Sequence, residues 1–320
     1  MNEVDISRVE RFRQFKNEIR GCDRFLIVGL DIGKSLHHGF LGSAKGKTVK
    51  RGVRVENSAR GFEHLLTSVQ FYMDRDGFKE VVFGLEPTSV YHKPLAEFLI
   101  TQGHLVVYVT NEAIKKNRAL LDGRWDKNDT KDAANAADLV AQGKCQFYDL
   151  PGIGLRDLRA LLSVRRRLKK QLHSSRVRIR NNLVAQYFPE LDKCWKQAQA
   201  ENLAIVRWCL SPHKISQLSF EEFFKMITTG NKGLRQYKRL SKIWEMAPYS
   251  IGCQPGIAMQ LEAQILVENI KSIEAQIALV DETIEDISLG FQEYQYLLSI
   301  PGFGPYVSAV VLAAIGTAQR

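Results

Sequence analysis

Four acidic residues stand where the sequence pattern predicts the functional edge of an α/β sheet. Asp31 follows an apolar run in Gly-Leu-Asp-Ile-Gly-Lys-Ser, and Glu86 follows another in Gly-Leu-Glu-Pro-Thr. Asp129 and Asp132 are spaced i, i+3, so a helix would carry both carboxylates on one face. Open α/β sheets build their sites at the carboxyl ends of strands, and an all-oxygen ligand set suits Mg²⁺ or Mn²⁺ better than zinc. Asp31, Glu86, Asp129 and Asp132 are therefore the predicted metal ligands and catalytic residues.

Such a set of carboxylates points to phosphodiester chemistry. Two ions roughly 3.5–4 Å apart can activate a nucleophile and stabilise the leaving oxygen. Any one acid could instead be a helix cap or a turn residue, and the joint pattern of acids, strand order and helix spacing is what favours the metal site. His37 and His38 follow the Asp31 turn and could approach the metal site, but a pair of strand histidines more often faces solvent or core, and we do not include them in the predicted site.

The Gly-Leu-Asp-Ile-Gly stretch leaves a second enzyme class open. Sugar kinases and actin-like ATPases (the ASKHA type) also begin with an acidic strand and turn that handle phosphate. That class requires a second α/β half with its own glycine-rich phosphate loop, whereas the pattern here turns to basic helices after Leu150. An ATP-dependent kinase is the less favoured alternative. It predicts that the protein binds ATP and has no affinity for nucleic acid.

Short apolar runs alternate with helical patterns over residues 24–150, which predicts an α/β domain behind a charged extension of residues 1–23. The expected strands cover residues 25–30, 36–41, 48–55, 81–85 and 105–109. The expected helices cover residues 57–74, 91–101 and 131–142, the last opened by Asp129 and Thr130.

Helical patterns replace the strands after Pro151. Residues 155–187 read as one long helix with an apolar stripe, ended by Pro189, and residues 259–287 repeat apolar positions every three to five residues. The two segments predict a coiled coil within an all-helical part, residues 151–290. Residues 190–255 read as a mostly helical insertion to which the sequence assigns no chemistry.

Most of the net charge lies on the first of these helices. The chain has 45 Lys and Arg against 35 Asp and Glu, a formal charge of +10, which favours a polyanionic partner. Residues 156–180 hold ten basic residues and Asp157 as their one acid. The predicted contacts to nucleic-acid phosphates are Arg165, Arg166, Arg167, Lys169, Lys170, Arg176, Arg178 and Arg180.

A glycine hairpin stands near the end of the chain. Pro-Gly-Phe-Gly lies between two apolar segments, the pattern of a helix-hairpin-helix, in residues 291–320. Backbone N–H groups at Gly302 and Gly304 could hold a DNA phosphate at the start of the second helix. A simple helix–helix turn is the plain alternative.

The cysteines, the N-terminus and the distribution of apolar residues bear on where the protein is found. Five cysteines are scattered without a Cys-x-x-Cys pair, so neither a zinc ribbon nor a disulfide framework is predicted. The N-terminus is charged, and no run of about eighteen apolar residues occurs. We expect a soluble cytoplasmic protein with no membrane partner.

Together these motifs resemble a known family, the Asp-Glu-Asp-Asp transposases of insertion-sequence family one-hundred-ten, relatives of the Piv-type DNA invertases. The resemblance rests on Val-Gly-Leu-Asp-Ile-Gly-Lys-Ser, Gly-Leu-Glu-Pro-Thr, Lys-Asn-Asp-Thr-Lys-Asp-Ala, the Arg-Arg-Arg-Leu…Arg-x-Arg-Asn-Asn-Leu helix and Ile-Pro-Gly-Phe-Gly-Pro, in this order. It implies a RuvC-like domain of the ribonuclease H superfamily, a coiled coil and a C-terminal transposase domain. It also implies that the four acids bind Mg²⁺ or Mn²⁺, and that the protein recombines DNA as a dimer or tetramer guided by a structured bridge RNA.

One departure from the family concerns its nucleophile. In the family a serine beyond the glycine hairpin attacks DNA covalently, and no residue up to Arg320 matches it, since Ser308 comes too early in the motif. Two expectations follow. Either the chain is the front part of a longer recombinase, or it is a C-terminally truncated copy that binds nucleic acid without recombinase activity.

Overall fold

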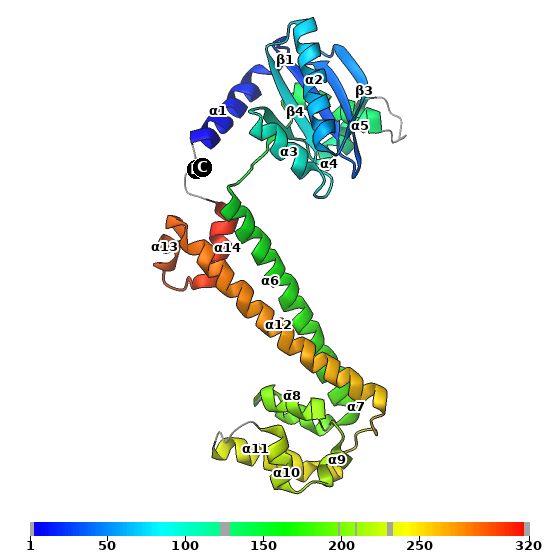
Figure 1. The fold of residues 1–320 in the computed structure, drawn as a ribbon, viewed down its shortest axis with the longest axis vertical. Helices are drawn as coiled ribbons and strands as arrows, with labels where there is room; N and C mark the ends of the chain where they lie inside the picture. Colours follow the sequence, from blue (N-terminus) through cyan, green and yellow to red (C-terminus); the bar gives the residue numbers. More distant parts are fainter. Residues whose placement is uncertain (1–2, 122–128, 198, 209, 229–232, 317–320) are drawn as a thin grey trace. The chain divides into compact units, whose positions relative to one another are not determined.

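The computed structural model describes residues 3–121, 129–197, 199–208, 210–228 and 233–316. They form two compact units, one up to Gly152 and one from Ile153 (Figure 1). The first is an α/β unit and the second is helical. Each unit has its own buried apolar clusters, so each is described separately.

A six-stranded mixed sheet forms the centre of the α/β unit, in the order β3-β2-β1-β4-β5-β6. β1 is antiparallel to β2 and parallel to β4; β2 and β3 are antiparallel, β4 and β5 parallel, and β5 and β6 antiparallel. The strands are β1 (Phe25–Asp31), β2 (Leu36–Ser43), β3 (Thr48–Glu56), β4 (Glu80–Glu86), β5 (Leu105–Tyr108) and β6 (Gln146–Phe147). The five strands predicted from apolar runs are present, and β6 is too short for such a pattern to reveal.

Helices cover both faces of this sheet because its central strands are apolar on both sides. Leu26, Val28 and Leu30 of β1 face a cluster with α2 (Ala59–Asp76) and α3 (His92–Thr101). Side chains alternate along the strand, so Ile27 points to the other face of the sheet. There it belongs to a second buried cluster, which includes residues of α5 (Asp129–Ala141). The cap of α2 is Ser58, whose hydroxyl accepts a hydrogen bond from the Gly61 N–H at 3.1 Å.

Two helices of this unit were not predicted, α1 (Glu3–Glu18) and α4 (Asn111–Leu121). Phe15 and Ile19 are buried in the same cluster as α5, and Arg8 Nη2 donates to the Tyr148 carbonyl at 2.8 Å. The expected charged extension is therefore part of the α/β unit. Its two buried apolar residues among those described are spaced i, i+4, which is too short an apolar stripe to be recognised among so many charged residues.

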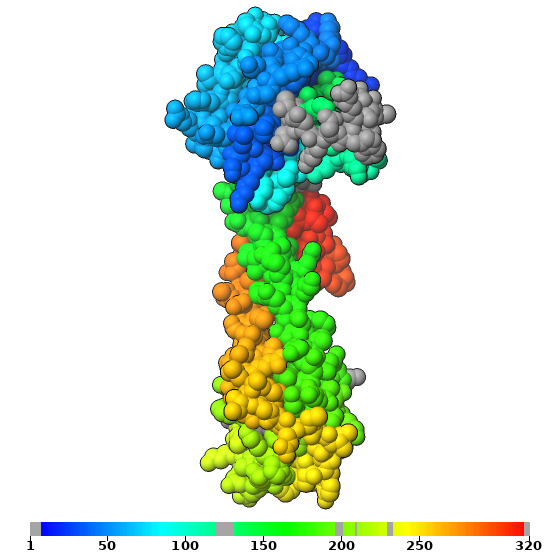
Figure 2. Space-filling model, turned by 90° about the vertical axis from the view of Figure 1, so that its right-hand side faces the viewer, coloured from blue at the N-terminus to red at the C-terminus, as the bar shows by residue number. Residues whose placement is uncertain are grey.

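Two long helices, α6 (Ile153–Arg178) and α12 (Ile257–Leu289), lie side by side in the helical unit (Figures 1 and 2). They run antiparallel, since Arg165 pairs with Asp281 while Arg178, farther along α6, pairs with Glu262. α6 continues through a π-helical segment, Ile179–Val184, into α7 (Ala185–Tyr187) and ends before Pro189. The predicted helix over residues 155–187 thus exists with a π-helical segment near its end.

The remaining helices pack at the two ends of this pair. Residues 189–249 form a bundle around buried residues such as Phe188, Phe223 and Leu240. Its elements are η2 (Pro189–Gln197), α8 (Gln199–Trp208), α9 (Pro212–Ser216), α10 (Phe220–Ile227), α11 (Leu234–Met246) and η3 (Ala247–Tyr249). At the other end α13 (Gln292–Leu298) and α14 (Pro305–Ile315) share a core with α6 and α12 through Leu158, Ile284 and Tyr294.

Within the described ranges, no helix combines the length and the hydropathy needed to cross a membrane. The four cysteines that the structure describes, Cys22, Cys145, Cys194 and Cys253, are all free thiols.

Candidate functional site

The strand register brings two of the four predicted acids together. β1 and β4 are parallel neighbours, and Asp31 is the direct partner of Glu86 at their carboxyl ends. Side chains alternate along a strand, so Asp31 projects on the same face as Gly29, and Glu86 on the same face as Gly84. That face of the sheet is the one covered by α5.

Glycines on both strands let α5 lie directly against the sheet. A Cβ on Gly29 would stand 2.6 Å from the Ala137 nitrogen and would also collide with the Ala133 carbonyl. A Cβ on Gly84 would stand 2.6 Å from Val140 Cγ2. Ile27, two residues earlier on β1 than Gly29, lines a pocket with Ala141, the last residue of α5. α5 therefore runs opposite to β1, and its first turns point toward the strand ends that carry Asp31 and Glu86.

Asp132 lies on these first turns and is buried. Its side chain is 3% exposed and forms an ion pair with Arg118 of α4, a side chain that is 26% exposed. Asp129 begins α5, but its side chain lies outside the described residues. The structure thus places three of the four acids, and it pairs Asp132 with Arg118.

A buried polar network holds α4 against α5. Asn117 Nδ2 donates to Asn135 Oδ1 at 2.6 Å and to Asp138 Oδ2 at 2.8 Å. Asn135 Nδ2 in turn donates to the Ile114 carbonyl at 2.8 Å. These bonds fix the spacing of the two helices, and with it the position of Arg118 next to Asp132.

The two histidines of β2 lie on opposite faces of the sheet. His38 is the direct cross-strand partner of Asp31, so it shares the face of the acids. His37 is fully buried on the other face, stacked on Phe62 with 6.2 Å between ring centroids, and burial lowers its pKa. Only the pairing of β1 with β2 distinguishes them, which is why the sequence left open whether either histidine approaches the acids.

The donor chemistry around Asp31 and Glu86 is that of a hard divalent cation, because both residues offer carboxylate oxygens. Among the side chains that the structure describes, however, no three His, Cys, Asp or Glu residues form a group that could hold a metal ion. The adjacent pair Asp31–Glu86 is the part of the predicted set that the described structure assembles. Asp132 is held by Arg118.

The predicted basic residues divide into two groups. Arg165 pairs with Asp281 and stacks on Tyr306 at 3.8 Å, and Arg180 pairs with Asp192 at 2.5 Å. Arg176 and Arg178 pair with acids of α12, each at 2.7 Å. Four residues are exposed and have no ion pair with any described residue: Arg166, Arg167, Lys169 and Lys170.

The glycine hairpin forms an exposed turn between α13 and α14. Gly302 has a φ of 89°, a conformation that favours glycine. Gly304 precedes the first turn of α14, and its carbonyl accepts from the Ser308 N–H at 3.0 Å. Ser308 itself is fully buried, which fits a packing residue.

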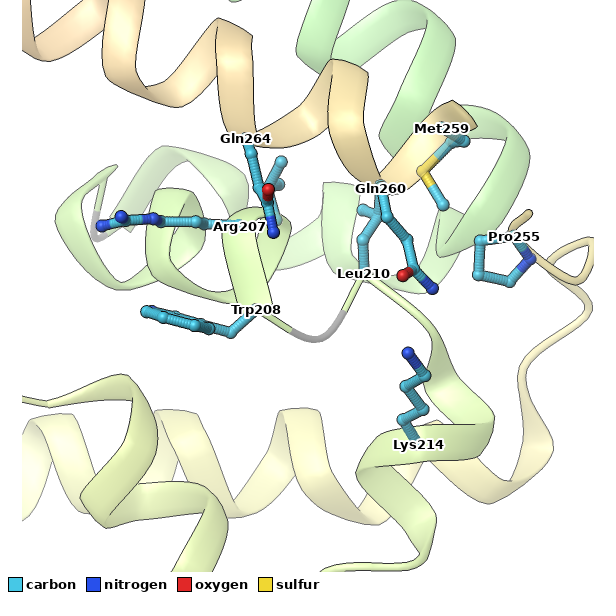
Figure 3. Close-up of a pocket in the computed structure, with 9 residues that line it drawn as sticks. Arg207, Trp208, Leu210, Lys214, Pro255, Met259, Gln260 and Gln264 are labelled. Atoms are coloured by element: carbon cyan, nitrogen blue, oxygen red, sulfur yellow. The ribbon is translucent and has the colours of Figure 1, made fainter. Parts of the chain in front are cut away.

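A shallow pocket of about 50 Å³ lies in the helical unit, between the ends of α8 and α9 and the start of α12 (Figure 3). Lys214 and Gln260 point toward one another across it, and Arg207 lies over the Trp208 ring at 4.9 Å. Arg207 also pairs with Glu268 at 3.0 Å. None of its lining residues belongs to the predicted acids or to the exposed basic group.

A sheet in which three antiparallel strands are followed by two parallel ones, with adjacent carboxylates at the central strand ends beneath a helix, defines a ribonuclease H-like α/β domain. The profile of the IS110-type DEDD transposases, described as "Transposase", matches residues 28–189, just over half of the 320-residue chain. The chain belongs to this family, as its motifs predicted. The matched region contains all four predicted acids and the basic helix α6.

A comparison with solved structures finds, among others, "T. thermophilus RuvC in complex with Holliday junction substrate". It is 13% identical, with a TM-score of 0.27, and the match covers 39% of this chain and 99% of RuvC. The strand order and the strand directions define the fold of the α/β unit. A comparison with curated proteins found no match.

Proposed function

We propose that this transposase acts on DNA phosphodiesters with an acidic site that uses Mg²⁺ or Mn²⁺, as part of site-specific recombination of an insertion sequence. The observation that carries the proposal is the register of Asp31 against Glu86 on the face covered by α5. Asp132 and Asp129 on the first turns of α5 are the further candidates for the ligand set.

Each part of the site has a distinct role in this proposal. Asp31 and Glu86 would hold the ion from two rigid neighbouring strands, which fixes their separation without loop motion. When bound, the divalent ion would polarise the phosphate and stabilise the negative charge on the attacking and leaving oxygens. Asp31 and Glu86 are half-buried, and the partial removal of water around the two carboxylates would strengthen their attraction for a cation.

Nucleic acid would be held mainly by α6. The four exposed basic residues, Arg166, Arg167, Lys169 and Lys170, offer phosphate contacts that are independent of base sequence. The N–H groups of Gly302 and Gly304 are a second candidate contact at the start of α14. By resemblance to the family we extend the proposal to a structured guide RNA and to a dimeric or tetrameric assembly.

The metal site is tested by titrating the full chain with Mn²⁺ in isothermal calorimetry. Asp31→Asn and Glu86→Gln are each expected to weaken Mn²⁺ binding at least tenfold, because each removes one carboxylate from the strand pair. Asp23→Asn is the matched control, since Asp23 is an exposed acid of the same unit that pairs with Lys45. Unchanged Mn²⁺ affinity in both site variants would contradict the proposal.

A further inference from the structure

The ion pair between Arg118 and Asp132 joins α4 to the first turns of α5, the helix that covers the face of the sheet carrying Asp31 and Glu86. The Asp132 side chain is 3% exposed, so its carboxylate has little contact with solvent. A buried carboxylate is strongly destabilising unless a cation or several hydrogen bonds compensate it. In the structure Arg118 Nη2 supplies that compensation.

Arg118 is held in this position by its surroundings. It follows Asn117, whose amide bonds to Asn135 and Asp138 tie α4 to α5. Asp132 in turn precedes Ala133, whose carbonyl packs against Gly29 of β1. The arginine and the carboxylate are therefore brought together by two fixed helices, one of which lies on the strand that carries Asp31.

The pair is incompletely satisfied. Arg118 Nε is buried and has no hydrogen-bond partner among the described residues. Buried polar groups in proteins are nearly always paired, and those that are not often mark functional sites. Arg–carboxylate pairs are often bidentate, whereas Arg118 contacts Asp132 through Nη2 and leaves its Nε without a partner among the described residues.

We propose that Arg118 is a built-in counter-cation for Asp132, which compensates this buried carboxylate in the metal-free protein and competes with the divalent ion for it. The inference rests on the proposed metal site and adds a residue that sets its affinity. A fixed positive charge in contact with one ligand carboxylate opposes the approach of a second cation to that carboxylate. Arg118 therefore keeps the metal-free fold stable and weakens metal binding.

The competition is measured by Mn²⁺ calorimetry and by thermal unfolding of the full chain with and without Mn²⁺. Arg118→Gln keeps a hydrogen-bond donor but removes the charge. It is expected to bind Mn²⁺ about tenfold more tightly than the parent chain, and to unfold at a lower temperature without metal. Arg118→Lys keeps the charge and is expected to stay close to the parent in Mn²⁺ affinity.

Two further variants separate this effect from general changes in charge. Lys116→Ala removes a cation from the same helix, where Lys116 pairs with the exposed Glu112 at 2.7 Å, and should leave Mn²⁺ affinity unchanged. In an Asp132→Asn background, Arg118→Gln should no longer tighten Mn²⁺ binding, because the carboxylate for which the two cations compete is gone.

Unchanged or weaker Mn²⁺ binding by Arg118→Gln would overturn the inference, and so would equal tightening in the Asp132→Asn background. These outcomes differ from a failure of the proposed function. If Asp31→Asn abolishes Mn²⁺ binding while Arg118→Gln leaves it unchanged, the metal site stands and the role of Arg118 does not. If Asp31→Asn and Glu86→Gln both bind Mn²⁺ like the parent, the site itself is wrong.

Discussion

At the scale of single residues, burial decides which histidines of the α/β unit can take up a proton. Burial lowers the pKa of His37, and likewise that of His92 and of His104. The unfolded chain protonates these rings near their ordinary value of about 6.5, whereas the folded unit resists protonation. Their contribution to stability is therefore fully present above about pH 6.5 and is lost as the pH falls below it.

This pH dependence can be tested at His37, the one of the three whose ring is fully buried. His37→Phe keeps an aromatic ring against Phe62 and removes the titrating group, so urea unfolding should lose less stability between pH 7.5 and pH 5.5 than in the parent chain. His64→Gln on the exposed side of α2 is the control and should leave the parent pH dependence intact. If His37→Phe has the same pH dependence of stability as the parent chain, then the buried His37 ring is not the source of that pH dependence.

At the scale of elements, pairing between helices decides how much of the charge on α6 is available to a ligand. The sequence places ten basic residues within residues 156–180, but α12 supplies acids to Arg165, Arg176 and Arg178. Those pairs hold the two long helices together. The exposed group from Arg166 to Lys170 is what remains to attract phosphate.

We expect the two groups of α6 to differ in their effect on DNA binding. Replacing Arg166, Arg167, Lys169 and Lys170 by Ala should weaken the binding of duplex DNA. It should also reduce the slope of log K against log salt concentration, by about 0.9 for each DNA phosphate that the variant no longer neutralises. The charge-neutral double variant Arg178→Ala/Glu262→Ala removes an existing ion pair and serves as the control. Fluorescence anisotropy over a series of salt concentrations measures both. Equal slopes for the fourfold variant and the parent would exclude this face from the interface.

At the scale of the whole molecule, the chain has two units with separate cores. The α/β unit is built on the clusters around β1 and α5, and the helical unit on those around α6 and α12. Units with independent cores commonly unfold independently. The proposed metal ligands all belong to the first unit, and the exposed basic residues of α6 belong to the second.

Scanning calorimetry of the full chain should therefore resolve two transitions, and Mn²⁺ should raise the temperature of one of them. A chain ending at Gly152 is expected to retain the Mn²⁺-sensitive transition, since it contains the whole sheet and the helices that cover it. The chain with Asp31→Asn is the control and should show two transitions without the Mn²⁺ shift. A Mn²⁺ shift of equal size in both transitions would contradict the assignment of the metal to the first unit.

Local patterns in the sequence were sufficient to predict most of the elements and the family. Apolar runs identify β1, β4 and β5, because central strands bury both faces, and a helical apolar stripe identifies α6 and α12. The positions of Asp31 and Glu86 at strand ends follow from the same runs. α1 and α4 were missed because their few buried residues are outnumbered by charged and polar ones, so their pattern resembles that of exposed chain.

Residue order along the chain specifies most strands and helices, the family, and the acids and cations available for chemistry. Packing in three dimensions selects which of those groups face one another. The ion pairs of α6 join residues about a hundred positions apart, Arg118 meets Asp132 across two helices, and His37 and His38 differ only in the side of the sheet they occupy. Secondary structure follows from neighbours along the chain, whereas the partner of a charge depends on distances that only packing sets.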